Sequence, residues 1–329
     1  MSFFTFIKIF AKFPLRFLKK IYYYVLCGFY FVKKKPTVVI HMDGGLCSQM
    51  HEFALGELFK DNGFCVRYDL NWFKEHGRCC FGKDARFFEI DKLYPRLRIK
   101  KASSVCTSVF DKYFRVQEID VEKCIAARKN LYLVNDRPLK FPSDRMVELM
   151  RTLFSNPAAP TDKENILVGD IIRQDLKSCA VHVRRGDLAD PKIAKDSGYG
   201  NCVTDKYYKT AVSIIKKLIP DVTFYFFSDD LAYVKNTLLP FLGDIKYRIV
   251  DENKGTVLNG GGYKDFYLIF LCKNQVCSLG SFGVDAAILN NNKDKVVVAT
   301  KELGQSVRNM VVLDFDGNVK RSTIDLGSD

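Results

Sequence analysis

The sequence predicts an α/β protein built from two units. Short hydrophobic runs rich in β-branched and aromatic residues alternate along the chain with longer segments of helical hydrophobic spacing. Residues 156–162, rich in proline and alanine, interrupt this alternation near the middle of the 329 residues. That length suits two domains of ordinary size. We therefore expect two Rossmann-like domains, residues 37–165 and 166–329, facing each other across a linker and preceded by a separate segment, residues 1–36.

The first unit begins with a strand, a glycine loop and a helix. Residues 37–41 are a β-branched run, and Asp43, Gly44 and Gly45 follow it after Met42. Residues 50–58 have helical spacing, and residues 64–68 are the next strand. This order is typical of a parallel βαβ unit. Between residues 80 and 135 the pattern is weaker, and it predicts one strand, residues 131–134.

The second unit repeats the alternation more clearly. Its continuous hydrophobic run at residues 222–227 predicts a strand that is buried on both faces. Thr204 and Ser228 are the expected N-caps of the two helices that follow them. In such sheets, ligands bind at the carboxyl ends of the strands. The predicted strands are residues 180–183, 222–227, 246–250, 276–277 and 296–299, and the predicted helices are residues 205–218, 229–239, 265–273 and 284–289.

The positive charge is concentrated at the N-terminus. The net charge is +13, but residues 1–36 hold eight Lys or Arg and no acidic residue, so the rest carries only +5. This argues against a nucleic-acid-binding surface spread over the fold, and we expect no nucleic-acid partner.

The same segment holds twelve aromatic residues. Its longest uncharged run, residues 21–32, is shorter than the roughly 20 residues of a spanning helix. We expect an interfacial helix on an anionic membrane surface, which makes the protein cytoplasmic and peripheral on the inner face of the plasma membrane. The alternative is a short signal-anchor, giving a type II membrane protein that faces a Golgi-like lumen.

The cysteines and histidines do not have metal-site spacing. The chain has 11 cysteines, no CxxC, and four scattered histidines. We therefore expect no metal, and we expect the cysteines to be small buried side chains in a reducing compartment.

A hydrophobic run at residues 179–183 leads directly into Arg184 and Arg185. Two guanidinium groups at the carboxyl end of a strand suit a diphosphate, because the arginine fork matches phosphate oxygens and stays charged. The alternative is structural: Asp187 pairs with Arg185 to shape the loop.

Residues 182–187, HVRRGD, resemble the HxRRxD motif of the α1,2-fucosyltransferases, glycosyltransferase family 11. Cys47 and Ser48 depart from this family's pattern in the glycine loop, and residues 278–285 lack its two tryptophans, so the resemblance is to a divergent member. The other stretches that resemble the family, in its order, are residues 44–50, Tyr207-Tyr208, residues 226–230, residues 265–274 and residues 289–295.

The resemblance implies a GT-B architecture and an inverting transfer of fucose from GDP-fucose to a galactoside hydroxyl, without a metal or any other cofactor. Arg184 would hold the β-phosphate and Arg185 would support the loop. The remaining implied nucleotide-binding residues are His182 close to the nucleotide, Gly44 and Gly45 where the backbone approaches the phosphates, Ser281 donating to a phosphate, and Asp265 accepting from guanine.

Some assignments stay open. Asp265 could instead serve the first turn of its helix. The base for the acceptor hydroxyl could be Asp187, Asp190 or Asp43. The expected acceptor is a glycan with a terminal galactose, on a lipid-linked bacterial surface oligosaccharide of the O-antigen kind. The alternatives are a transferase with another GDP-sugar or linkage, and a non-catalytic, membrane-attached binder of anions or RNA.

Overall fold

The computed structural model describes residues 35–75, 86–116, 119–134, 144–196, 198–253, 261–304 and 307–327, with Val25 and Gly28. The membrane-associating helix expected in residues 1–36 therefore lies almost entirely outside the described residues. Within the described ranges, no helix has both the length and the hydrophobicity to cross a bilayer.

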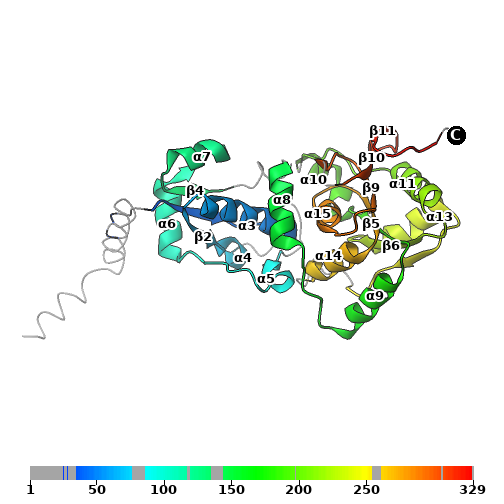
Figure 1. The fold of residues 1–329 in the computed structure, drawn as a ribbon, viewed down its shortest axis with the longest axis horizontal. Helices are drawn as coiled ribbons and strands as arrows, with labels where there is room; N and C mark the ends of the chain where they lie inside the picture. Colours follow the sequence, from blue (N-terminus) through cyan, green and yellow to red (C-terminus); the bar gives the residue numbers. More distant parts are fainter. Residues whose placement is uncertain are drawn as a thin grey trace, which may run out of the picture. The chain divides into compact units, whose positions relative to one another are not determined.

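Contacts divide the chain into two compact units (Figure 1). The first unit comprises Met1–Asp43, Leu55–Glu75 and Arg98–Pro138, and the second comprises Gly44–Ala54, His76–Leu97 and Leu139–Asp329. This division differs from the expected boundary between residues 165 and 166. One reason is that helix α8 (Asp144–Phe154) packs on α15 (Phe282–Leu289), where Arg151 Nε donates to the Ile288 carbonyl at 3.0 Å.

The first unit is built on a parallel sheet of four strands in the order β2-β1-β4-β3. The chain passes from β1 to β2 on one side, and then reaches β3 and β4 on the other side of β1. The strand order therefore reverses between β1 and β4. The strands are β1 (Thr37–His41), β2 (Cys65–Asp69), β3 (Arg115–Val116) and β4 (Leu131–Leu133), and the helices are α4 (Asn71–Glu75), α6 (Ser104–Tyr113), α7 (Val121–Ala127) and the second half of α3 (Leu46–Asp61).

The second unit contains a sheet of seven strands in the order β11-β10-β9-β8-β5-β6-β7. All neighbours are parallel except β10 and β11. The chain runs from β5 to β6 and β7, and then returns to β8 on the other side of β5. The strands are β5 (Ser178–Val183), β6 (Thr223–Ser228), β7 (Tyr247–Ile249), β8 (Asn274–Cys277), β9 (Val296–Ala299), β10 (Asn309–Leu313) and β11 (Val319–Ser322).

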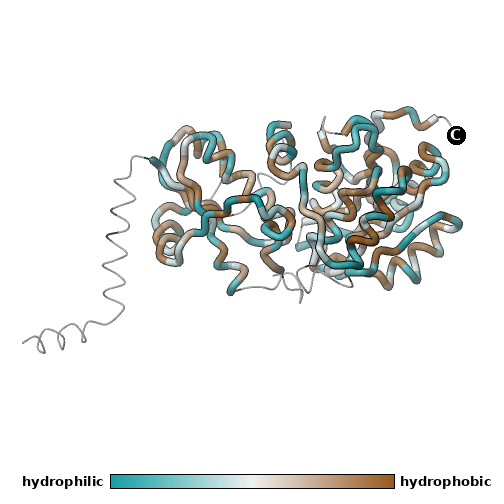
Figure 2. Tube along the Cα trace, turned by 60° about the horizontal axis from the view of Figure 1, so that its bottom comes forward, coloured by the Kyte–Doolittle hydropathy of each residue, from teal (hydrophilic) through white to brown (hydrophobic). Residues whose placement is uncertain are grey.

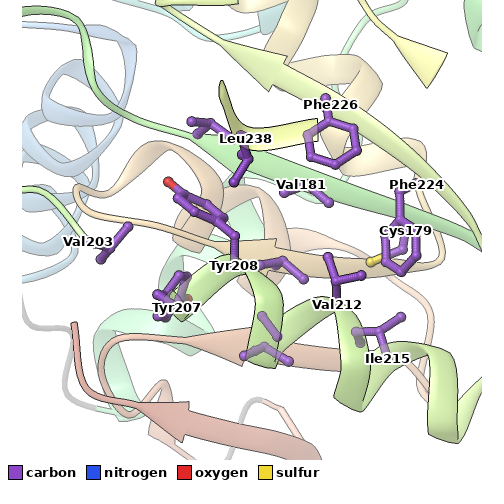
Figure 3. Close-up of a cluster of buried hydrophobic side chains, with 14 of the residues drawn as sticks. Cys179, Val181, Val203, Tyr207, Tyr208, Val212, Ile215, Phe224, Phe226 and Leu238 are labelled. Carbon is purple, nitrogen blue, oxygen red and sulfur yellow. The ribbon is translucent and has the colours of Figure 1, made fainter. Parts of the chain in front are cut away.

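Helices cover both faces of this sheet, which is why β5 is buried at every residue. On one face, α11 (Asp205–Leu218) packs on alternate residues of the strands; Figure 3 shows Tyr208 and Val212 beside Val181 of β5. On the other face, α15 and α8 pack against residues that include Cys277 and Val297. Figure 2 shows the resulting alternation of hydrophobic and hydrophilic segments along the chain.

Further helices complete the second unit. They are α5 (Ile90–Leu93), α9 (Lys163–Gln174), α10 (Pro191–Asp196), α12 (Leu231–Tyr233), α13 (Leu239–Leu242) and α14 (Gly262–Leu271), with a 3₁₀ helix η2 (Gly186–Ala189) and a π-helix η3 (Val234–Leu238).

Two sequence expectations were wrong in detail. The helix expected at residues 229–239 is instead the succession α12, η3 and α13, and its N-cap is Asp230 rather than Ser228. Thr204 does occupy the N-cap position of α11, but its hydroxyl makes no cap hydrogen bond and donates to the Phe315 carbonyl at 3.1 Å.

Candidate active site

The loop that carries Arg184 and Arg185, the arginine loop, follows β5 directly. It lies where the strand order of the second unit reverses, which is the switch point of the sheet. The chain continues from β5 to β6 on one side, while β8 lies on the other side of β5. Ligands of open α/β sheets bind outside the carboxyl ends of the strands at such a point. Here the backbone N–H of Arg184, just after β5, donates to Ser278 Oγ, just after β8, at 2.9 Å.

Asp229 holds the arginine loop from the end of β6. Its Oδ1 accepts from the backbone N–H groups of Arg185, at 2.8 Å, and Gly186, at 3.0 Å. Its Oδ2 forms an ion pair with the guanidinium of Arg184. One carboxylate therefore fixes the backbone of the loop and also the direction of the first arginine side chain.

Because Gly186 has no Cβ, the Asp229 carboxylate can lie against the loop beside the Arg184 guanidinium. A Cβ added at Gly186 would lie 2.6 Å from Asp229 Oδ2 and 3.0 Å from Arg184 Nη1. Contacts that short do not occur, so a larger residue would displace the ion pair.

Arg185 packs on a different partner. Its guanidinium lies 4.1 Å from the centre of the Tyr233 ring, and its Nε lies 3.6 Å from Asp230 Oδ2. The role expected of Arg185, to support the loop, stays a prediction. The alternative partner, Asp187, lies in η2, but its side chain is outside the described part of the structure.

His182 is buried beneath the loop. Its ring lies 5.5 Å from the Phe282 ring, its Nδ1 lies 3.4 Å from Ser278 Oγ, and a Cβ on Gly283 would come within 3.0 Å of it. Burial, assisted by the Arg184 charge, lowers the pKa of His182 to about 3. The imidazole is therefore neutral near pH 7, and direct contact with a nucleotide stays a prediction.

The glycine loop belongs to the same unit as the arginine loop. Gly44 has a φ of +71°, a left-handed conformation that favours glycine, whereas a Cβ at Gly45 would meet nothing within 4 Å. In the first turn of α3, the Cys47 thiol donates a hydrogen bond to Asp285 and accepts one from Ser281, the N-cap of α15. Burial, and then Asp285, raises the pKa of the Cys47 thiol well above its ordinary value.

A buried histidine–carboxylate pair fastens α3 to α15. His51 Nε2 lies 2.9 Å from Asp285 Oδ2, and the two side chains are 1% and 2% exposed. The pair lies one helical turn beyond Cys47 on α3 and one turn beyond Ser281 on α15. The structure therefore brings the predicted residues Gly44, Gly45 and Ser281 into one region of the second unit.

Asp265 lies in the first turn of α14, as the sequence suggested. Its Oδ1 accepts from the Asn253 amide at 2.6 Å, and Asn253 exchanges hydrogen bonds with Asn165. A role in guanine recognition stays a prediction.

The three base candidates lie in separate local structures. Asp190 is exposed and accepts from the Lys192 N–H at 2.8 Å at the start of α10. Asp43 belongs to the first unit, with its Oδ2 at 3.7 Å from His41 Nε2. The side chain of Asp187 is outside the described part. The base therefore stays a prediction.

Five residues of the site were not predicted from the sequence: Asp229, Tyr233, Ser278, His51 and Asp285. Asp229 was expected only at a helix start. The FFSDD stretch that resembles the family was the available signal for Asp229.

The described ranges contain neither a metal-site arrangement of side chains nor a disulfide. There, no group of three or more His, Cys, Asp or Glu side chains is arranged as a metal site. The eight described cysteines are free, and six of them are buried: Cys47, Cys106, Cys124, Cys179, Cys272 and Cys277.

Comparison with known families finds a match within the second unit. Residues 158–313 match the sequence family described as glycosyl transferase family 11. The O-antigen biosynthesis glycosyltransferase WbnK of Escherichia coli is 26% identical over 133 residues, 40% of this chain and 41% of that protein. The galactoside 2-alpha-L-fucosyltransferase Sec1 of Mus musculus is 32% identical over 122 residues, 36% of this chain and 30% of that protein.

A longer match is to an alpha-1,2-colitosyltransferase of Escherichia coli, 24% identical over 281 residues, 80% of this chain and 90% of that protein. Among solved structures, the fucosyltransferase NodZ from Bradyrhizobium aligns with a TM-score of 0.44 and 13% identity, covering 88% of this chain and 98% of NodZ.

The family match includes the arginine loop and both strands of the switch point, β5 and β8. The relatives above carry the names of O-antigen, galactoside 2-fucosyl and 1,2-colitosyl transferases. Over residues 158–313, the chain is therefore similar to glycosyl transferase family 11.

Proposed function

We propose that this protein is an inverting, metal-independent glycosyltransferase that moves fucose from GDP-fucose to the 2-hydroxyl of a galactoside. The observation that carries the proposal is the placement of Arg184 at the carboxyl end of β5, where the strand order reverses, with its backbone on Ser278 and its guanidinium on Asp229. In this position the guanidinium would hold the β-phosphate of the donor.

The arrangement suits the departure of GDP. Breaking the bond between the sugar and the phosphate puts negative charge on the leaving diphosphate, and donors that are already oriented stabilise such charge. Arg184 and Ser281 would supply side-chain donors, and the Gly44–Gly45 backbone would approach the phosphates without a Cβ at either position. The neutral His182 beneath the loop adds no charge of its own.

The acceptor follows from the relatives alone. WbnK is named for O-antigen biosynthesis and Sec1 for a galactoside acceptor. We therefore propose a lipid-linked bacterial oligosaccharide with a terminal galactose, glycosylated at the cytosolic face of the plasma membrane. Residues 1–36 would hold the enzyme on the anionic surface through their eight basic residues.

A second donor is favoured by one specific observation. The match to the alpha-1,2-colitosyltransferase extends over 80% of this chain, about twice the share matched by Sec1. A GDP-linked sugar other than fucose, transferred to the same hydroxyl, is therefore the alternative reaction.

A donor panel tests the proposal. The full-length protein is incubated with terminal galactosides and with GDP-fucose, GDP-colitose, GDP-mannose or UDP-galactose, and the released nucleotide and the glycosylated product are measured. We expect GDP-fucose to give product. Product from GDP-colitose alone would replace fucose as the donor sugar, and product from UDP-galactose alone would contradict a GDP-sugar donor.

The non-catalytic alternative is separated by deleting residues 1–36. A transferase keeps its affinity for GDP without this segment, because the arginine loop lies in the second unit. A charge-driven binder of lipids or RNA would lose its ligand, because eight basic residues are removed.

A further inference from the structure

Lys301 follows the carboxyl end of β9, at the same edge of the sheet as the arginine loop. β9, β8 and β5 are neighbouring parallel strands of the second unit. Continued beyond the strand ends, the β8–β9 register sets Lys301 opposite Leu279, and the β5–β8 register sets Arg184 opposite the same residue. Neighbouring strands lie about 4.8 Å apart, so the backbones of the two basic residues are about 10 Å from each other, on the two sides of the loop that leads to Ser281.

The side chain of Lys301 belongs to the face of the sheet that α15 covers. Alternate residues of β9 and of the segment after it, Val297, Ala299 and Leu303, pack in one hydrophobic cluster with residues of α15. Side chains alternate between the two faces of a strand, and Lys301 comes between Ala299 and Leu303 in this series. Burial lowers the pKa of Lys301, whereas the Asp285 carboxylate in the first turn of α15 acts in the opposite direction. Lys301 is therefore half-buried near the N-terminal end of α15.

The Asp285 carboxylate beside Lys301 is shared with other groups. The Cys47 thiol donates to Asp285, and His51 Nε2 lies 2.9 Å from Asp285 Oδ2. The Cys47 and Cys277 thiols also lie within electrostatic range of Lys301, but burial raises the pKa of both, to about 12 for Cys277, so they carry no charge at neutral pH. A half-buried ammonium beside a carboxylate that already has two other partners is stabilised by a further anion.

The guanidinium of Arg184 lies on the side of the arginine loop away from Lys301. It forms an ion pair with Asp229, just after β6, and β6 and β8 lie on opposite sides of β5. Lys301 lies beyond β8, at the end of β9. The acidic residue next to it in sequence, Glu302, pairs with Arg321 of β11, with 2.6 Å between Oε1 and Nη1. Two cations placed in this way can each hold one phosphate of a diphosphate.

We propose that Lys301 binds the α-phosphate of the GDP-sugar. The inference rests on the proposed function, in which Arg184 holds the β-phosphate. The ammonium of a lysine is a compact charge with three donors, which suits the oxygens of one phosphate. Lys301 and Arg184 both belong to the second unit, so the diphosphate would be held from two sides by residues of one unit.

Lys301→Met tests the assignment, because it removes the charge and keeps an apolar stem of similar length. The dissociation constants of guanosine, GMP and GDP are measured by competition against a fluorescent guanine nucleotide. We expect GMP and GDP to bind about 10- to 100-fold more weakly, the range for a hydrogen bond to a charged group. Guanosine has no phosphate and should bind within twofold of wild type. Equal GMP affinities in wild type and Lys301→Met would overturn the inference.

The three ligands separate a phosphate contact from a structural effect. Since GMP and GDP both carry the α-phosphate, Lys301→Met should keep the wild-type ratio of their dissociation constants, whereas Arg184→Lys should weaken GDP alone. A loss in Lys301→Met confined to GDP would contradict the assignment to the α-phosphate. A loss of equal size for guanosine would show a disturbed fold and would overturn the phosphate contact.

Two further variants control for charge. Lys301→Arg keeps the positive charge and should restore most of the GMP affinity. Lys320→Met removes a lysine from β11 of the same sheet, one that is 62% exposed and lies 3.2 Å from Asp314, and should bind all three ligands like wild type. Equal losses in Lys320→Met and Lys301→Met would show that only the net charge matters and would overturn the inference.

The outcomes also separate this inference from the proposed function. If the wild-type protein binds GMP and GDP and Lys301→Met binds them equally well, only the assignment of Lys301 is wrong. If the wild-type protein binds neither nucleotide, the proposed function fails and the role of Lys301 fails with it.

Discussion

The backbone N–H of Arg184 donates to the hydroxyl of Ser278 at 2.9 Å, although 94 residues separate the two in sequence. The hydrogen bond joins the loops after β5 and β8, which lie on the two sides of the switch point in the second unit. It fixes the backbone from which the Arg184 guanidinium is presented, and Asp229 fixes the guanidinium itself.

Asp229→Asn should weaken GDP binding by about 10- to 100-fold. The variant keeps an oxygen for the N–H groups of Arg185 and Gly186, but it replaces the carboxylate beside Arg184 with a neutral amide. Hydrogen bonds to charged groups contribute about 1.5–3 kcal/mol, which corresponds to this range. Calorimetric titration with GDP measures the effect. Asp221→Asn removes an exposed carboxylate paired with Lys177 and serves as the control. Equal affinities in the two variants would show that Asp229 does not orient Arg184.

Substitutions in the glycine loop should separate folding from ligand binding. Gly44→Ala places a side chain at a φ of +71° and 2.9 Å from Ser48 Oγ, so it should lower the free energy of unfolding by about 1–2 kcal/mol. Gly45→Ala meets nothing within 4 Å and should unfold like wild type but bind GDP more weakly. Gly169→Ala, with ordinary contacts of 3.5 Å or more in α9, is the control for both measurements. Wild-type GDP affinity in Gly45→Ala would remove this backbone from the phosphate site.

The buried His182 should make the fold sensitive to acid. Burial, with the Arg184 charge, lowers the pKa of His182 to about 3 in the folded protein, whereas an unfolded histidine titrates near 6.5. Between these values the unfolded state binds a proton that the folded state does not, so stability falls as the pH drops below about 6.5. The expected loss is about 2 kcal/mol between pH 7.5 and pH 5.

Urea unfolding of wild type and His182→Gln at several pH values checks this contribution. The variant cannot titrate at this position, so its stability should fall less steeply over the same range. Identical slopes in the two proteins would contradict a neutral, buried His182.

Transfer should persist in excess EDTA, because arginines and backbone donors would carry the charge that a metal carries in other transferases. The assay is product formation after dialysis against EDTA, compared with added Mn²⁺ or Mg²⁺. Complete loss of activity that either metal restores would contradict the proposed mechanism.

The fold was predictable where burial leaves a periodic pattern. The predicted ranges of α11 and β9, residues 205–218 and 296–299, are confirmed to the residue, because each buries one face or both faces in a sheet with helices on either side. The helix expected at residues 229–239 breaks into α12, η3 and α13. Pro240, in the first turn of α13, has no N–H for a hydrogen bond to the preceding turn.

Only the part of the site whose residues are contiguous in sequence could be predicted. The arginine loop follows a hydrophobic strand, so its position at the carboxyl end of that strand could be predicted from residues 179–185 alone. Asp229 and Ser278 could not be assigned in this way, because their proximity to Arg184 depends on which strands become neighbours. The β5–β6 register sets Val183 opposite Ser228, and the β5–β8 register sets His182 opposite Cys277. Neither register can be predicted from the residues of one strand alone.

The ratio of GMP to GDP dissociation constants, compared between wild type and Arg184→Lys, measures whether Arg184 holds the β-phosphate. If Arg184 holds the β-phosphate, wild type should bind GDP at least tenfold more tightly than GMP, because only GDP offers that phosphate to the guanidinium fork. Arg184→Lys should lose most of this preference while its affinity for GMP stays within about twofold of wild type, since a single ammonium cannot replace the fork. A lysine variant that keeps the wild-type ratio, together with wild-type turnover, would show that Arg184 does not hold the β-phosphate.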